Sequence, residues 1–437
     1  MKCKVLWLMF TLVVLSVAVQ AQTLAHIERA DSFLSAVLNN QYSTVEQLSH
    51  ERLAKQLDST KLVQILEQIY GAYGEFSSQW MVSAEKQKGF IEVIYNTHFK
   101  NDSCSFRIVM DEEGKVMGFW VNPVHKKLSF NPPPYADQSK FDEVQVTIGD
   151  ENWPLPGTLS LPKGKGPHPV VILIHGSGPH DRDETVKKNK PFRDIAFGLA
   201  TQGIAVLRYD KRTYVHADKL SGGITAREEV LDDVAAAVAF VHQSEEVDQN
   251  AIFLLGHSLG GMLAPVAAKE NEEVAGIIML AAPAHGFAET ALRQIRYLKS
   301  LPDSLGGSSG PSVDAMIQTG EKIVEGTADK STAFLGANAG YYYNLDEQQH
   351  LETARSLTIP IFIGHAENDY QVVDEDYELW KEALASNDDA KFKSYEGLFH
   401  LFIPSTGIPS PSDYEIEGNV SNTLISDLAE WIHKHGK

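Results

Sequence analysis

The sequence predicts an α/β fold in which a doubly wound, mostly parallel sheet follows a smaller α+β domain. From about residue 141, apolar runs typical of buried strands alternate with segments of helical periodicity, which is the pattern of consecutive β-α-β units. Before that point, helical patterns come first and strand patterns follow. The chain has 437 residues, too many for one ordinary core, which also indicates two domains.

The first residues, MKCKVLWLMFTLVVLSVAVQAQ, have the pattern of a secretory signal. Lys2 and Lys4 precede an apolar run that is too short for a spanning helix, and Val19 and Ala21 fit a cleavage site. We therefore expect residues 1–21 to be a signal peptide and the protein to be secreted or periplasmic. The alternative is an uncleaved membrane anchor. We expect no membrane span after signal removal.

The segment 22–135 predicts the small α+β domain. Its helical patterns cover residues 26–38, 43–57 and 60–73, and its strand patterns cover residues 78–86, 89–99 and 105–121. This order fits helices packed on one face of an antiparallel sheet. The mature chain keeps a single cysteine, Cys104, so no intrachain disulfide can form, and we expect a buried structural thiol.

The segment 136–437 predicts the larger domain, after a proline-rich segment, 130–140, that is typical of a linker. Between Pro283 and Ile359 the alternation of strand and helix fails over too many residues for a plain connection. We expect an inserted helical cap at about 285–357.

The charge of the chain argues against nucleic acid as a partner. The formal net charge is −20, and removal of the two lysines of the signal, which contains no acid, gives −22 (−20 minus 2). Binding to phosphates needs clustered Lys and Arg, which such a chain does not offer.

The motif G-x-S-x-G, residues 256–260, lies between an apolar strand pattern and a helical pattern. In this context the chain must turn sharply, and Gly256 and Gly260 lack the Cβ atoms that would clash there. Such a turn would present Ser258 as a nucleophile at the start of the helix. The alternative is an ordinary glycine-rich connection.

The motif HGSG, residues 175–178, follows the apolar strand pattern VVILI. Acyl transfer needs N–H donors aimed at the developing oxyanion. We expect the backbone N–H of Leu259, directly after the nucleophile, to be one donor and that of Ser177 to be the other.

A base and an acid must complete such a site. His400 follows the last strand pattern and a glycine, which is the place for the histidine in the chain order Ser, Asp, His. The acid should leave the sheet one strand earlier, where the sequence reads GHAENDYQVVDED. This stretch holds five carboxylates, Glu367, Asp369, Asp374, Glu375 and Asp376, and the last three are expected in the first turn of the next helix. The alternatives for such an acidic loop are a solvated surface and a cation site.

The motifs HGSG, GHSLGG, DYQV and GLFH resemble those of the α/β-hydrolase superfamily, in its bacterial esterase, thioesterase and serine-aminopeptidase-like branches. The resemblance covers residues 141–437 and implies Ser258 as nucleophile, His400 as base and the acid of D-x-x-V, Asp369, as third member. These proteins often have Gly three residues before the acid, where this chain has Ala366. Counting from Gly364 would select Glu367, which stays the alternative.

The segment before residue 136 resembles a domain of unknown function that is often found ahead of secreted bacterial hydrolases. We therefore expect a secreted serine hydrolase that cleaves a carboxylic ester through an acyl-enzyme, without metal or organic cofactor. Its partner would be a small-molecule or acylated substrate, and the oligomeric state stays open. The alternatives are a peptidase, an acyl-thioesterase or a non-catalytic binding protein. An aminopeptidase would need carboxylates in the cap, where Asp314, Glu321 and Glu325 are available.

Overall fold

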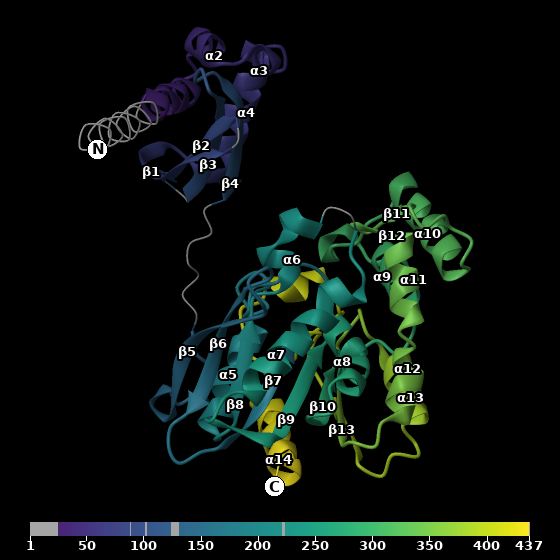
Figure 1. Ribbon diagram of the computed structural model, residues 1–437. Helices are drawn as coiled ribbons and strands as arrows, with labels where there is room; N and C mark the ends of the chain where they lie inside the picture. The colour runs from purple at the N-terminus through teal and green to yellow at the C-terminus, as the bar shows by residue number, and fades with distance from the viewer. Residues whose placement is uncertain (1–24, 88, 101–102, 124–130, 221–222, 437) are drawn as a thin grey trace, which may run out of the picture. The chain divides into compact units, whose positions relative to one another are not determined.

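The computed structural model describes residues 25–436 except 88, 101–102, 124–130 and 221–222. The chain divides between Ser129 and Phe130 into two compact units, which are described one at a time (Figure 1). The expected signal peptide, residues 1–21, lies outside the described residues.

The first unit is a four-stranded antiparallel sheet with helices on one face. The strands pair in the order β1-β2-β3-β4: β1 (Phe76–Gln87), β2 (Phe90–Phe99), β3 (Ser103–Asp111) and β4 (Val116–Pro123). The helices are residues 25–38, α2 (Tyr42–Leu48), α3 (Glu51–Ala54) and α4 (Ser59–Tyr73). Phe33, Leu62 and Phe106 are fully buried between the two layers, and Cys104 is buried as predicted.

The single helix predicted over residues 43–57 is wrong, because two short helices, α2 and α3, occupy this segment. The chain turns at His50, whose backbone is extended and whose ring accepts a hydrogen bond from the Arg52 N–H at 3.2 Å. The His50 N–H donates to the carbonyl of Val116 at 2.8 Å instead of to a helical partner. A tertiary hydrogen bond thus overrides the helical periodicity.

The second unit is built on an eight-stranded sheet with the order β14-β13-β10-β9-β7-β8-β6-β5. Its strands are β5 (Phe141–Ile148), β6 (Leu155–Pro162), β7 (His168–Ile174), β8 (Ala205–Tyr209), β9 (Val247–His257), β10 (Val274–Leu280), β13 (Ile361–Ala366) and β14 (Ala390–Tyr395). β6 runs antiparallel to β5 and β8, and the remaining neighbours are parallel. The predicted fold class is confirmed.

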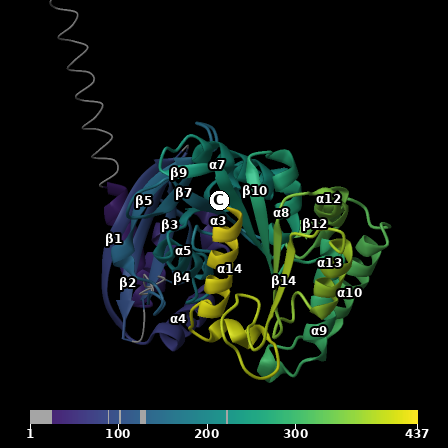
Figure 2. The ribbon, with the colours of Figure 1, turned by 90° about the horizontal axis from the view of Figure 1, so that it is seen from below.

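Helices cover both faces of this sheet. α5 (Pro191–Thr201) and α14 (Asn422–His435) pack on one face, as Figure 2 shows. The other face is covered by α7 (Asp232–His242), α8 (Leu259–Glu270) and α13 (Asp374–Ala383). Alternate residues of the central strands β7 and β10 contribute to the two cores, so these strands are almost entirely apolar, as expected for buried parallel strands.

The long connection between β10 and β13 contains the expected helical insertion (Figure 1). It comprises α9 (Phe287–Ser300), α10 (Pro311–Val324), the short pair β11 (Ala333–Phe334) and β12 (Ala337–Asn338), α11 (Ala339–Glu347) and α12 (His350–Ser356). α12 packs against α8 and α13, so it belongs to the helical layer over the sheet. We use the word cap for the segment from α9 to α11.

The proline-rich segment after residue 130 packs on the second unit. The Tyr135 hydroxyl donates to the carbonyl of Val420 at 2.7 Å. Across the part of the chain that the structure describes, no helix combines the length and apolarity needed to cross a membrane.

Candidate active site

The topology brings the predicted site segments to one edge of the sheet. The HGSG loop follows β7 and Ser258 follows β9, and these strands are parallel neighbours. Asp369 and His400 follow β13 and β14, which are also parallel neighbours. Because the carboxyl ends of parallel strands meet at the same edge, four segments that are distant in sequence converge there.

Ser258 occupies a sharp turn between β9 and α8. Its φ of 53° and ψ of −119° lie in a region that L residues rarely adopt. A Cβ at Gly256 would lie 2.2 Å from the Gly260 carbonyl oxygen, and a Cβ at Gly260 would lie 2.2 Å from that of Ile174. Both glycines are therefore required. Because α8 begins at Leu259, the Leu259 N–H has no acceptor inside the helix.

The structure brings Asp369 and His400 together. Asp369 Oδ2 lies 2.6 Å from His400 Nδ1, and both side chains are buried. The other oxygen, Oδ1, accepts from the Gln371 N–H at 2.7 Å. The alternative acid, Glu367, is exposed and accepts from the Ser394 hydroxyl at 2.7 Å. Of the two carboxylates, only Asp369 contacts His400 among the described contacts.

Backbone hydrogen bonds fix the two loops that carry this pair. The Glu367 N–H donates to the Tyr395 carbonyl at 3.1 Å, and the Asn368 N–H donates to the Leu398 carbonyl at 2.9 Å. These two bonds join the loops after β13 and β14 at positions shortly before Asp369 and His400 in the chain.

The remaining acids of this stretch begin α13, as predicted. Asp374 and Glu375 are exposed, but Asp376 is fully buried. Its carboxylate pairs with His285 at 2.9 Å and with Arg293 of α9. Asp376 therefore anchors the cap to the sheet layer, a role that the sequence pattern did not indicate.

His257, next to Ser258, contacts both the His400 loop and Glu184. Its Nε2 donates to the His400 carbonyl at 3.0 Å, and its Nδ1 lies 3.0 Å from Glu184 Oε2. Burial would lower the pKa of His257, but the Glu184 carboxylate raises it above the usual value. Burial would likewise raise the pKa of Glu184, but the charge of His257 lowers it to about 2. The two groups thus form a buried ion pair.

The described contacts include no hydrogen bond between the Ser258 hydroxyl and His400. The Ser258 N–H donates to the Leu280 carbonyl at 2.9 Å, which fixes the backbone of the turn. Hydrogen bonds between nucleophile and base are often long without substrate and shorten in the substrate complex.

Several peptide groups of the HGSG loop form hydrogen bonds with side chains. The Gly176 N–H donates to Glu184 Oε1 at 2.6 Å, and the Gly178 N–H donates to Glu229 Oε1 at 2.9 Å. The Ser177 carbonyl accepts from His180 Nε2 at 2.9 Å. The Ser177 N–H has no acceptor within the described part of the chain.

This loop also lies against Ser258. A Cβ at Gly176 would be 3.4 Å from the Cβ of Ser258. The ammonium of Lys211 donates to two carbonyls of the loop, those of Gly176 at 2.7 Å and Gly178 at 3.0 Å. None of these bonds occupies the Ser177 N–H, which belongs to the loop segment next to the serine turn.

Sequence reasoning missed the residues that support this loop, namely Glu184, Lys211 and Glu229. Two of them lie in the charged stretches HDRDE (180–184) and RYDKR (208–212), which follow β7 and β8. Their density of charge beside apolar strands was the available signal. The sequence around Glu229 contains no such signal, because Glu229 lies in an ordinary amphipathic helical pattern.

Within the described residues, no group of three or more His, Cys, Asp or Glu side chains could hold a metal ion. The groups that the converging loops bring together are a hydroxyl, an imidazole, a carboxylate and backbone N–H donors.

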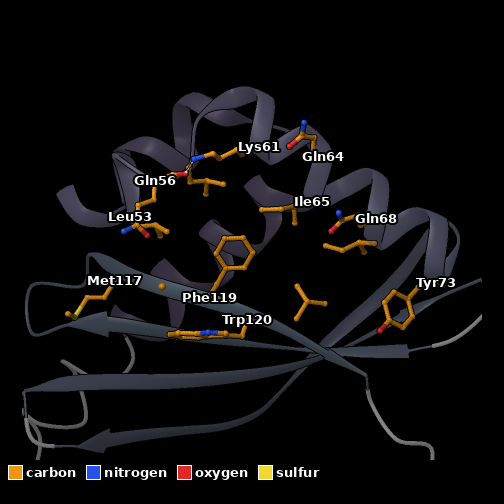
Figure 3. A pocket seen from close by; sticks show the side chains of 14 residues that line it. Leu53, Gln56, Lys61, Gln64, Ile65, Gln68, Tyr73, Met117, Phe119 and Trp120 are labelled. Carbon is orange, nitrogen blue, oxygen red and sulfur yellow. Dashed lines mark hydrogen bonds between the residues drawn. The ribbon is translucent and has the colours of Figure 1, made fainter. Parts of the chain in front are cut away.

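The first unit has an open cleft of about 780 Å³ between α4 and β4 (Figure 3). Apolar side chains such as Phe119 and Ile65 line it together with the amides of Gln64 and Gln68. Its lining includes no serine, cysteine, histidine or carboxylate among the described residues. The lining of the cleft thus lacks the residue types of a Ser-His-Asp triad.

Residues 165–404, more than half of the chain, match the family described as serine aminopeptidase, S33. The chain belongs to this family. It is a serine hydrolase of the α/β-hydrolase superfamily, as the motifs predicted. Residues 30–119 match a family described as a protein of unknown function, DUF3887.

Two curated relatives and one solved structure illustrate the similarity. The esterase EstD of Thermotoga maritima is 37% identical over 344 residues, which are 78% of this chain and 80% of that protein. The phospholipase YtpA of Bacillus subtilis is 26% identical over 249 residues, 54% of this chain and 90% of that protein. Est1E from Butyrivibrio proteoclasticus has 18% identity and a TM-score of 0.45, with 67% of this chain and 98% of that chain covered.

Proposed function

We propose that this hydrolase cleaves a carboxylic ester through an acyl-enzyme, with Ser258 as nucleophile, His400 as base and Asp369 as the acid that orients it. The observation that carries the proposal is the 2.6 Å contact between Asp369 and His400 at the edge where the strained Ser258 turn lies. A buried carboxylate that binds Nδ1 fixes the tautomer in which Nε2 can accept a proton.

In this mechanism Ser258 attacks the acyl carbonyl while His400 takes its proton. The N–H groups of Leu259 and Ser177 stabilise the oxyanion of the tetrahedral intermediate. His400 then protonates the leaving alcohol, and water attacks the acyl-enzyme with His400 again as base. Glu367 has no part in the reaction.

An ester is favoured over a peptide for two reasons. The curated relatives are an esterase and a phospholipase, and both names denote cleavage of ester bonds. Two of the cap carboxylates that an aminopeptidase could use are engaged, since Asp314 pairs with Lys299 and Glu321 pairs with Arg296. These ion pairs join α9 to α10 and leave fewer carboxylates for a substrate amine. A thioester stays the second candidate, because the same triad would cleave it.

We also propose that the protein is exported, on the strength of the signal pattern in residues 1–21. The N-terminal sequence of protein purified from the periplasm or medium tests this, with cleavage after Ala21 as the expected result. Retention of these residues in a membrane fraction would contradict export as a soluble protein.

Labelling with a fluorophosphonate probe tests the nucleophile. We expect labelling of the full chain and its loss in Ser258→Ala, while the matched control Ser394→Ala still reacts. Labelling that persists in Ser258→Ala would overturn the mechanism. A panel of acyl esters, aminoacyl amides and acyl thioesters then tests the substrate class, with the highest kcat/KM expected for an ester.

A further inference from the structure

Lys211, Glu229 and Tyr341 form a buried cluster behind the HGSG loop, which we call the loop clamp. The side chains of Lys211 and Glu229 are each 2% exposed, and Lys211 Nζ lies 2.8 Å from Glu229 Oε1. With its bonds to the carbonyls of Gly176 and Gly178, Lys211 uses all three of its donors. One ammonium thus fixes the peptides on both sides of Ser177.

Glu229 completes the hold on the loop. Its Oε1 accepts from the Gly178 N–H as well as from Lys211. Burial would raise the pKa of Glu229, but the charge of Lys211 and the hydrogen bonds that the carboxylate accepts keep this pKa below the usual value. The carboxylate therefore stays ionised. It lies in a π-helical turn, Arg227–Leu231, a rare geometry that often marks functional positions.

The cap reaches this cluster directly. The hydroxyl of Tyr341, in α11, donates to Glu229 Oε2 at 2.5 Å. Three residues further along α11, Asn344 Oδ1 accepts from the Ala226 N–H at 2.9 Å, just before the π-helical turn. The cap is thus bonded at two points to the segment that carries Glu229.

We propose that Lys211 and Glu229 are positioning residues of the oxyanion hole and that Tyr341 is the link through which the cap controls it. The proposal rests on the proposed function. If the clamp is released, the peptides around Ser177 lose their anchors and can rotate, so the Ser177 N–H no longer faces the developing oxyanion. If the cap moves away, Tyr341 no longer binds Glu229, and turnover falls. If the cap lies over the substrate, the Tyr341–Glu229 bond is kept and the Ser177 N–H stays in place.

Ion pairs that merely support a fold do not require this geometry. A buried salt bridge is by itself weak evidence for stability. Here the pair binds the carbonyls of Gly176 and Gly178 and the Gly178 N–H, and none of these bonds occupies the Ser177 N–H that the reaction needs.

The test compares Tyr341→Phe with the matched control Tyr343→Phe in the full chain. The Tyr343 hydroxyl donates to the Ala328 carbonyl at 3.0 Å, so it bonds elsewhere. Kinetics are measured on an oxoester and on the thionoester of the same acid and alcohol. Sulfur is a weak acceptor, so the thionoester depends less on the oxyanion hole.

We expect Tyr341→Phe to lower kcat for the oxoester by about tenfold with little change in KM, less than the 10²–10³-fold loss of a whole donor. The rate ratio of oxoester to thionoester should fall with it, and Tyr343→Phe should match the wild type. Glu229→Gln should give a larger loss, about 10²-fold. If thermal melting shows that Glu229→Gln is unfolded, Tyr341→Phe decides alone.

A wild-type kcat and rate ratio in Tyr341→Phe would overturn the proposal. A rise in KM alone would overturn it as well, because Tyr341 would then act by contact with the substrate. Turnover that survives in Ser258→Ala would instead defeat the proposed function, so the two failures are distinguishable.

Discussion

The two sides of the candidate site are built in different ways. On the base side, Asp369 and His400 follow neighbouring strands, and two backbone hydrogen bonds between their loops align them. On the oxyanion side, the HGSG loop is held by buried charges, Glu184 and the clamp residues Lys211 and Glu229. The base side therefore depends on sheet register, and the oxyanion side depends on side chains that come from several segments.

This difference shows why the two sides tolerate change differently. A backbone-aligned pair loses its chemistry when one group is replaced, but its loops keep their place. A loop held by buried ion pairs loses its place when one partner is removed, because the remaining charge stays buried without compensation.

The largest expected effect is on the base side. Asp369→Asn should lower kcat by about 10⁴-fold, or about 5 kcal/mol of barrier, because an amide in place of the carboxylate favours the wrong tautomer of His400. Steady-state kinetics on the preferred ester measure the loss, and thermal melting should show a folded protein.

The control for that variant is Glu367→Gln. Its exposed side chain meets only Ser394 among the described contacts, so activity should stay within about twofold, as is usual for surface substitutions. If Glu367→Gln lost activity and Asp369→Asn kept it, the register of the acid loop would be wrong.

The next largest effect concerns the oxyanion side. Glu184→Gln leaves the His257 ring without its counter-ion, so unfolding should become easier by roughly 3–5 kcal/mol at neutral pH. Because the folded pKa of Glu184 is about 2, below its unfolded value near 4.5, this contribution is present above about pH 4.5 and is lost as the pH falls toward 2. Denaturant titrations of both proteins at neutral and acid pH measure it.

In Glu184→Gln the amide oxygen can still accept from the Gly176 N–H, so the kcat loss should be moderate, about tenfold. Equal unfolding free energies of variant and wild type at neutral pH would contradict the buried ion pair. That result would also mean that buried charges do not distinguish the HGSG side of the site from the side of Asp369 and His400.

The smallest expected effect is a pH dependence at His175, the buried first residue of the HGSG loop. Burial lowers its pKa to about 3, so the folded protein keeps it neutral while the unfolded chain takes up a proton near pH 6.5. The unfolded state then binds more protons as the pH falls, and stability should drop by up to about 1.4 kcal/mol per pH unit below about 6.5.

His175→Asn should flatten this pH dependence, although lost packing against Phe192 lowers the stability at neutral pH. Urea unfolding between about pH 7 and pH 5 measures both. The matched control is His433→Asn, whose ring is exposed on α14 and should leave the pH dependence unchanged. An identical slope in His175→Asn and the wild type would contradict the assignment.

The sequence predicted the fold class and the segments of the site because both depend on local patterns. Apolar strands alternating with helices predict a parallel sheet, and G-x-S-x-G between a strand and a helix predicts the strained turn at Ser258. The same local reasoning failed at residues 43–57, where the bond of His50 to Val116 breaks the helix. It could also not choose between Glu367 and Asp369 from the residues alone.

By itself, then, the sequence determined the alternation of strands and helices and the motifs at the strand ends, because both are visible in local periodicity and spacing. Only the tertiary structure decided which carboxylate meets His400, that Asp376 holds the cap, and that Lys211, Glu229 and Tyr341 meet behind the HGSG loop. These contacts join residues far apart in the chain, and buried charges find partners through space rather than through spacing in the sequence.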